Sequence, residues 1–146
     1  MPATASATNV ETIKAVYSAF GRGDVPAILE MLSDDVRWEH WENYFAHREG
    51  VAWLEPRTGR EGAAEFFEVV GTFDIAEFSV LDIMASDQQV AATILIDAKV
   101  PGGGRLRDEE IHLWTFDTDG RICAMRHYAD TAKHIAAANG EDTTAR

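Results

Sequence analysis

The fold is decided by one stretch of the chain, Ile111-His-Leu-Trp-Thr-Phe-Asp-Thr-Asp-Gly-Arg-Ile-Cys-Ala-Met-Arg-His-Tyr128. Its two alternating halves predict a pair of strands, and Asp119-Gly120 is favoured in two-residue hairpin turns because both positions must accept positive φ. Counting outward from this turn places six side chains on one face as three facing pairs: Phe116 with Cys123, Trp114 with Met125, and His112 with His127. Two histidines are therefore expected side by side on a face otherwise built of aromatic and sulfur-containing residues.

The rest of the chain supplies more strands and three helices. Segments 34–41, 74–85 and 89–100 alternate or are rich in β-branched and aromatic residues, which predicts three further strands. Three other segments carry apolar stripes at helical spacing. Each follows a residue suited to cap a helix: Thr8, Asp24 and Thr58. Helices first and a strand meander last predict an α+β fold, in which a curved antiparallel sheet wraps around an N-terminal helical hairpin and a third helix and encloses a cavity.

Length and composition fit one domain in the 146 residues. We expect the domain at 9–136, with flexible tails at 1–8 and 137–146, because the tails have few large apolar groups. Against 13 basic residues the chain has 25 acidic ones, a net charge of −12 that disfavours nucleic acid and anionic membranes as partners. The single cysteine, Cys123, rules out an internal disulfide, and with no signal peptide at the start we expect a cytoplasmic protein.

The facing histidines indicate acid–base chemistry. Burying two imidazoles together disfavours protonating both, which lowers at least one pKa and leaves a neutral base near physiological pH. The alternative is that each is a core histidine with a hydrogen-bonded partner. His47 and His134 are expected to face solvent without a special role.

Four motifs give residues 9–132 a family resemblance. They are Gly21-Arg-Gly-Asp24 after the first helix, Leu32-Ser-Asp-Asp-Val-Arg-Trp38, Gly59-Arg-Glu-Gly62, and Asp119-Gly-Arg-Ile-Cys-Ala-Met-Arg-His-Tyr-Ala-Asp-Thr131. In these the chain resembles the SnoaL-like branch of the nuclear transport factor 2 superfamily, which includes ketosteroid isomerase, limonene epoxide hydrolase and scytalone dehydratase. The resemblance implies a cone-shaped fold, no cofactor and a homodimer through the open sheet face.

The resemblance also implies site residues. The general-base aspartate of ketosteroid isomerase falls on His40 and its oxyanion-hole acid on His112, while the last-strand aspartate of the hydrolase and cyclase falls on His127. These three histidines are the expected catalytic residues, and no metal is expected. A second set is expected to bind substrate, from the strands, the first helix and the irregular segment 41–54: Trp38, Trp114, Met125, Phe116, Tyr17, Glu110, Tyr44, Phe45 and Trp53.

These expectations point to a cofactor-independent acid–base enzyme that acts on a small apolar carbonyl compound, as an isomerase, cyclase or dehydratase. His127 would remove a proton α to the carbonyl, and His40 or His112 would donate to the enolate oxygen. Two alternatives stay open. One is a metal site formed by the three histidines with Glu110, and the other is a binding or interaction module without turnover.

Overall fold

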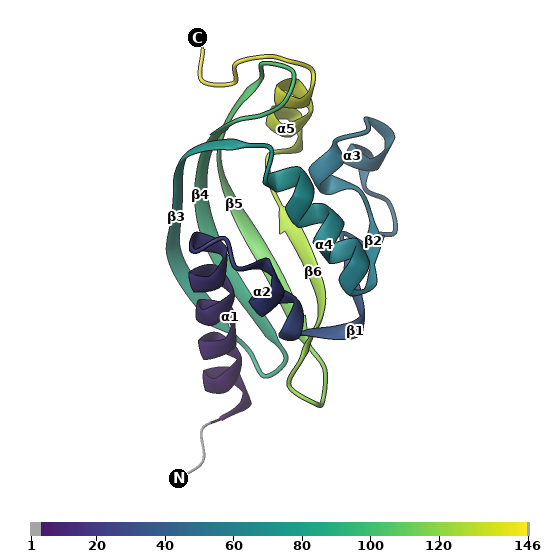
Figure 1. Cartoon of the computed structure of the whole chain (residues 1–146), viewed down its shortest axis with the longest axis vertical. Helices are drawn as coiled ribbons and strands as arrows, with labels where there is room; N and C mark the ends of the chain where they lie inside the picture. The colour runs from purple at the N-terminus through teal and green to yellow at the C-terminus, as the bar shows by residue number, and fades with distance from the viewer. Residues whose placement is uncertain (1–3, 146) are drawn as a thin grey trace.

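One six-stranded sheet dominates the computed structural model, which describes residues 4–145 (Figure 1). The strand order is β2-β1-β6-β5-β4-β3, and all neighbours are antiparallel except the parallel pair β1–β6. The strands are β1 (Leu32–Trp38), β2 (Arg57–Thr58), β3 (Asp74–Ala85), β4 (Gln89–Lys99), β5 (Arg105–Phe116) and β6 (Ile122–Tyr128). The α+β class and the predicted strand meander are confirmed.

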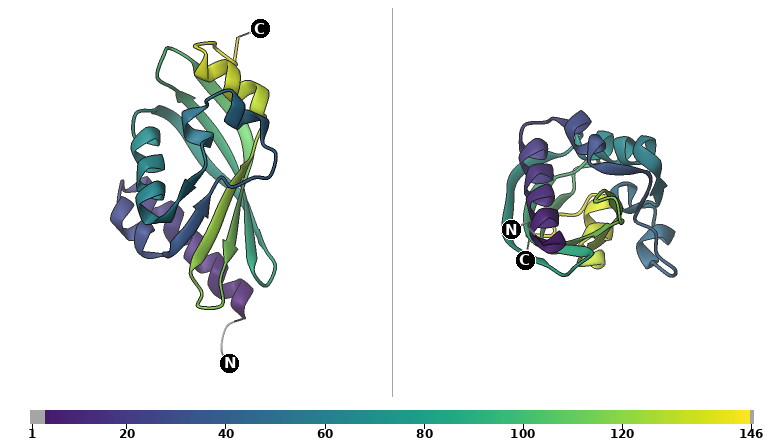
Figure 2. Two further views of the ribbon diagram at one scale, coloured as in Figure 1. Left: turned by 90° about the vertical axis from the view of Figure 1, so that its right-hand side faces the viewer. Right: turned by 90° about the horizontal axis from the view of Figure 1, so that it is seen from below.

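The helices lie on the inner side of the curved sheet or at its end (Figure 2). They are α1 (Ala5–Gly21), α2 (Val25–Glu30), α3 (Phe45–Arg48), α4 (Gly59–Val70) and α5 (Thr131–Ala138), with a 3₁₀ turn η1 (Ala52–Leu54). Helix α1 packs against β3 and β4, and α4 packs against β1, so the sheet encloses an apolar interior between them. No helix within residues 4–145 combines the length and the apolar character that crossing a membrane requires.

The first helix begins earlier than predicted. The hydroxyl of Thr4, not Thr8, caps it by accepting a hydrogen bond from the Ala7 amide at 3.2 Å. Helix α1 thus begins within the segment 1–8 expected to be a tail, of which residues 1–3 lie outside the described part. Asp24 caps α2 as predicted, whereas the side chain of Thr58 makes no capping bond to α4.

The segment after residue 136 is also part of the fold. Helix α5 continues to Ala138, and the following residues pair with the start of β5. The Arg105 amide donates to the Glu141 carbonyl at 3.0 Å, and the Thr143 amide donates to the Arg105 carbonyl at 2.9 Å. The domain boundary predicted at residue 136 therefore falls inside a helix.

The β5–β6 turn is wider than predicted, yet the histidine pairing is the predicted one. The Asp117 carboxylate accepts from the amides of Asp119 and Arg121, and Gly120 has a φ of 78°, which is typical of a three-residue loop closed by a left-handed glycine. The wider loop pairs Phe116 with Ile122, so the predicted partner Cys123 is wrong. A bulge at Cys123 then restores the predicted register: Trp114 faces Met125 and His112 faces His127.

Candidate functional site

A cavity of about 60 Å³ lies between the sheet and the helices. Its walls are mainly aromatic and include Trp38, Phe66, Phe67, Phe78 and Trp114. Five titratable side chains also line it: Tyr17, Glu110, His112, His127 and His134. Apolar walls with a few convergent polar groups are typical of sites for small organic molecules.

His127, on β6, is held by a carboxylate that sequence reasoning missed. Oε1 of Glu39 lies 2.5 Å from Nδ1 of His127 and also accepts a hydrogen bond from the His127 backbone amide at 2.6 Å. The other oxygen, Oε2, accepts from the Trp41 indole at 2.8 Å. Because Nδ1 is bound in this way, Nε2 is the ring nitrogen left for chemistry, and it has no hydrogen-bond partner within residues 4–145.

A single backbone angle brings Glu39 inward. Strand β1 ends at Trp38, and Glu39 has a φ of 59°, in the left-handed region where a non-glycine residue costs about 1–2 kcal/mol. This turn ends the alternation on which the inward placement of His40 depended. His40 instead directs Nε2 to the Arg57 carbonyl at 2.9 Å and the Thr58 hydroxyl at 3.1 Å, outside the cavity. The predicted convergence of His40 with the other two histidines is wrong.

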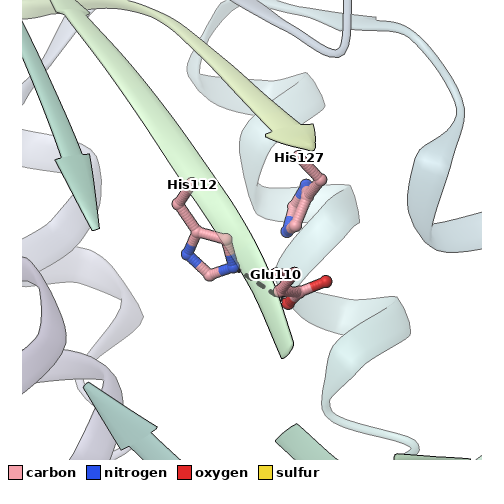
Figure 3. Close-up of side chains that lie close together, drawn as sticks. All are labelled: Glu110, His112 and His127. Atoms are coloured by element: carbon pink, nitrogen blue, oxygen red, sulfur yellow. Dashed lines mark hydrogen bonds and ion pairs between the residues drawn. The ribbon is translucent and has the colours of Figure 1, made fainter. Parts of the chain in front are cut away.

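His112, on β5, belongs to a chain of hydrogen bonds with one consistent direction, of which Figure 3 shows the link to Glu110. The Trp114 indole can only donate, and it donates to the Tyr17 hydroxyl at 3.1 Å. Burial lowers the pKa of His112 and keeps its ring neutral, and its Nε2 faces the ionised Glu110, which can only accept; Nδ1 is therefore the unprotonated nitrogen and accepts the Tyr17 hydroxyl proton at 2.8 Å. Nε2 of His112 then carries a proton and donates it to Oε1 of Glu110 at 3.0 Å.

His134 is buried at the cavity, so its expected solvent exposure is wrong. The Trp53 indole donates to Nδ1 of His134 at 2.8 Å, which requires the proton of a neutral ring to sit on Nε2. That proton goes to Oδ2 of Asp108 at 2.9 Å. Both ring nitrogens are thus engaged, and His134 joins α5 to η1 and β5.

The facing histidines have opposite pKa shifts, with ring centroids 4.5 Å apart. Burial and the nearby charge of His127 lower the pKa of His112. Burial also disfavours the charged form of His127, but the carboxylate of Glu39, its hydrogen bond and the charge of Glu110 outweigh burial and raise the pKa of His127. Burial would raise the pKa of Glu110, yet the hydrogen bond from His112 and the favourable electrostatic interaction with the neighbouring imidazoles lower it to about 2. His112 is thus biased to the neutral form and His127 to the charged form.

Two sets of side chains have the spacing of metal ligands. Each set has ligand atoms within 4.8 Å of one another: Glu110, His112 and His127, and Asp108, Glu110 and His134. In the second set the Trp53 indole occupies Nδ1 of His134, so Nε2 carries a proton and has no lone pair for a metal. The first set could hold a metal only if His112 moved its proton from Nε2 to Nδ1 and reversed its hydrogen bond with Tyr17.

The other residues expected to bind substrate divide into two groups. Six of them lie on the cavity wall: Tyr17, Trp38, Trp53, Glu110, Trp114 and Met125. Three do not. Phe116 is buried in the core beside the turn, the Tyr44 hydroxyl donates to the His127 carbonyl at 3.4 Å, and Phe45 is 52% exposed beneath the guanidinium of Arg48.

Comparisons with known proteins give a family and several structural relatives. The model of the family described as SnoaL-like domain matches residues 13–125. An NTF2-like protein of unknown function from Burkholderia pseudomallei K96243 is 25% identical, with a TM-score of 0.74 over 89% of this chain and 96% of that one. A Jannaschia sp. CCS1 protein, provisionally named a SnoaL-like polyketide cyclase, is 18% identical, with a TM-score of 0.71 over 95% of this chain and 96% of that one. TerC, co-crystallised with polyporic acid, is 22% identical, with a TM-score of 0.71 over 90% of this chain and 98% of that one. Among curated proteins, none matches the sequence.

Proposed function

Because this chain belongs to the SnoaL-like domain family, we propose that it is a cofactor-independent acid–base enzyme acting on a small apolar carbonyl compound. The reaction would be an isomerisation, a cyclisation or a dehydration, each of which begins by removing a proton next to a carbonyl. One observation carries the proposal. The Glu39–His127 pair presents one unbound imidazole nitrogen to a cavity with aromatic walls.

His127 is the proton-exchanging group. The raised pKa of His127 makes it a stronger base in its neutral form, whose fraction grows as pH rises. In that form Nε2 takes a proton from the carbon α to the carbonyl, and the electron pair of that C–H bond moves into the enolate. The imidazolium that forms is stabilised by Glu39, whose carboxylate binds the opposite nitrogen at 2.5 Å. The same Nε2–H can then return the proton to a different atom, while in a cyclisation the enolate carbon attacks a second carbonyl.

The donor proposed for the enolate oxygen, in place of His40 or His112, is the Tyr17 hydroxyl, which would turn its one proton from Nδ1 of His112 to that oxygen. Tyr17 lies on the cavity wall, and burial raises its pKa, so it keeps its proton. The Trp114 indole donates to the same oxygen at 3.1 Å, which strengthens Tyr17 as a donor. His112 then acts as a positioning residue, because it holds Tyr17 from one ring nitrogen and Glu110 from the other.

Hydrogen–deuterium exchange tests this proposal without knowledge of the natural substrate. A panel of small cyclic ketones is incubated in deuterium oxide with the protein, and loss of the α-proton signal is followed by NMR. Removal of the base in His127→Ala should slow enzyme-dependent exchange by roughly two to four powers of ten. His40→Ala is the matched control, since His40 lies outside the cavity, and it should stay within about twofold. Full exchange activity in folded His127→Ala protein overturns the assignment.

A further inference from the structure

One carboxylate oxygen at the cavity has no hydrogen-bond donor. The Glu110 side chain on β5 is 4% exposed, and its Oε1 accepts from His112. Its Oε2 is buried and has no hydrogen-bond partner within residues 4–145. Native proteins leave few buried polar atoms unpaired, and an unpaired oxygen on a charged group is especially costly.

The fold does not supply the missing donor. Nε2 of His134 lies 3.5 Å from Oε2, but its proton is already given to Oδ2 of Asp108 at 2.9 Å. The Trp53 indole holds Nδ1 of the same ring, so His134 cannot turn its other nitrogen toward Glu110 without losing that bond. His134 is therefore held by partners of its own and does not pair with Oε2.

We infer that Oε2 of Glu110 accepts a hydrogen bond from a hydroxyl group of the substrate, which makes the substrate a neutral hydroxylated carbonyl compound. The inference rests on the proposed function for the carbonyl, which is placed at His127. The two groups are near enough for one small molecule to reach both, since ligand atoms of Glu110 and His127 lie within 4.8 Å (Figure 3).

The buried carboxylates around the cavity favour a substrate with a hydroxyl group over one with a negative charge. Three buried carboxylates, those of Glu39, Asp108 and Glu110, lie at this end of the molecule, and only the ring of His127 is biased to carry a compensating positive charge. A substrate carboxylate would add a further negative charge in a site with aromatic walls, where such repulsion is poorly screened. An ammonium group could also donate, but it would lose its hydration on entering an apolar cavity, a penalty that a hydroxyl largely avoids.

The same carboxylate restricts the chemistry at that hydroxyl. Glu110 is ionised and accepts protons, so it cannot protonate the hydroxyl to release it as water. The hydroxyl that binds Oε2 is retained in the product, and within the proposed function this favours isomerisation or cyclisation over loss of that group.

Binding of matched probes tests the inference separately from turnover. The probes are meta-hydroxyacetophenone, meta-methoxyacetophenone, the anion meta-acetylbenzoate and the cation meta-(aminomethyl)acetophenone. Binding is followed by quenching of tryptophan fluorescence, since Trp38 and Trp114 line the cavity. We expect the hydroxy probe to bind at least about tenfold more tightly than the methoxy probe, and more tightly than either charged probe.

Two variants complete the test. Glu110→Gln replaces Oε2 or Oε1 by an amide and should reduce the hydroxy-to-methoxy preference to about twofold or less, whereas Glu109→Gln, at an exposed position, should keep it. A wild-type protein that shows the hydroxy-to-methoxy preference but exchanges no α-protons would count against the proposed function alone. Equal binding of hydroxy and methoxy probes by the wild-type protein overturns the inference, as does tightest binding of either charged probe. These wild-type comparisons decide the matter even if Glu110→Gln does not fold.

Discussion

Replacing Glu39 by glutamine tests the central arrangement of the site. The Glu39 side chain is fully buried and accepts three hydrogen bonds, two from His127 and one from the Trp41 indole. Glutamine has one carbonyl oxygen. If that oxygen faces His127, the amide nitrogen faces the indole N–H of Trp41. Both groups are donors, so the amide N–H and the indole N–H are each left without an acceptor.

The expected loss in the free energy of unfolding follows from these hydrogen bonds. An unpaired buried donor costs about 1–3 kcal/mol, and loss of the carboxylate charge opposite His127 adds about 1–2 kcal/mol while the imidazole is protonated. We therefore expect Glu39→Gln to lower the free energy of unfolding by roughly 2–4 kcal/mol at about pH 5.5. The substitution should also slow α-proton exchange, by about tenfold or more, because it weakens the base at His127.

The pH dependence has a definite sign. Glu39 helps to raise the pKa of His127 above its ordinary value of 6.5, so the stability that this adds is complete below 6.5 and is lost as pH rises through the raised pKa. The cost of Glu39→Gln should accordingly be smaller by about 1–2 kcal/mol at about pH 8.5 than at about pH 5.5. His112, with a lowered pKa, has the opposite dependence, but it is present in both proteins and its contribution largely cancels in the comparison.

Denaturant unfolding at the two pH values measures the stability, and the imidazole proton signals in NMR spectra report the titration of His127. The midpoint for His127 should fall in Glu39→Gln. Glu42→Gln removes an exposed carboxylate from the same segment and should change neither quantity. An equal cost at both pH values, together with an unmoved His127 midpoint, would refute the reasoning.

Three further results are expected. Trp53→Phe removes the donor to Nδ1 of His134 and should cost about 1–3 kcal/mol in urea unfolding, so a change below about 0.5 kcal/mol would contradict the assigned tautomer. In Gly104→Ala the new Cβ would collide with the Ala137 carbonyl oxygen of α5, and the melting temperature should fall by several degrees. Gly21→Ala has open space and should melt like the wild type, so equal melting of both variants would contradict the α5 contact. Calorimetric titration with Zn²⁺ should show no site tighter than about micromolar, because His112 holds a proton on Nε2, and tight binding that disappears in His112→Ala would support a metal site instead.

The predictable part of the site depends on period-two alternation. His112 and His127 face one another because both strands of the hairpin are regular on either side of the turn, and the bulge at Cys123 offsets a turn one residue wider than expected. The wider turn shifts the register by one residue and the bulge shifts it back, so the histidines keep the predicted pairing. Only Phe116, which lies between the turn and the bulge, kept the wrong partner.

The parts that could not be predicted depend on single dihedral angles and on distant contacts. Alternation continued past Trp38 assigns His40 to the cavity, and nothing in the local sequence shows that Glu39 adopts a positive φ. That angle is held by the bonds of Glu39 to His127, 88 residues away. His134 lies in an eight-residue helix whose pattern is too short to assign a buried face, and its partner Trp53 is 81 residues away.

Hydrogen-bond direction, more than burial, sets the two imidazoles apart. Both rings are almost fully buried, so desolvation opposes the charge on each of them to a similar degree. His112 receives a proton from Tyr17 on one nitrogen, which closes that nitrogen to protonation, whereas His127 has Glu39 on one side and an unbound nitrogen on the other. An added proton can therefore be accommodated only on His127, and its charge in turn disfavours a charge on His112, 4.5 Å away between ring centroids. A facing pair of like residues thus becomes one proton carrier and one fixed support for the Tyr17 donor.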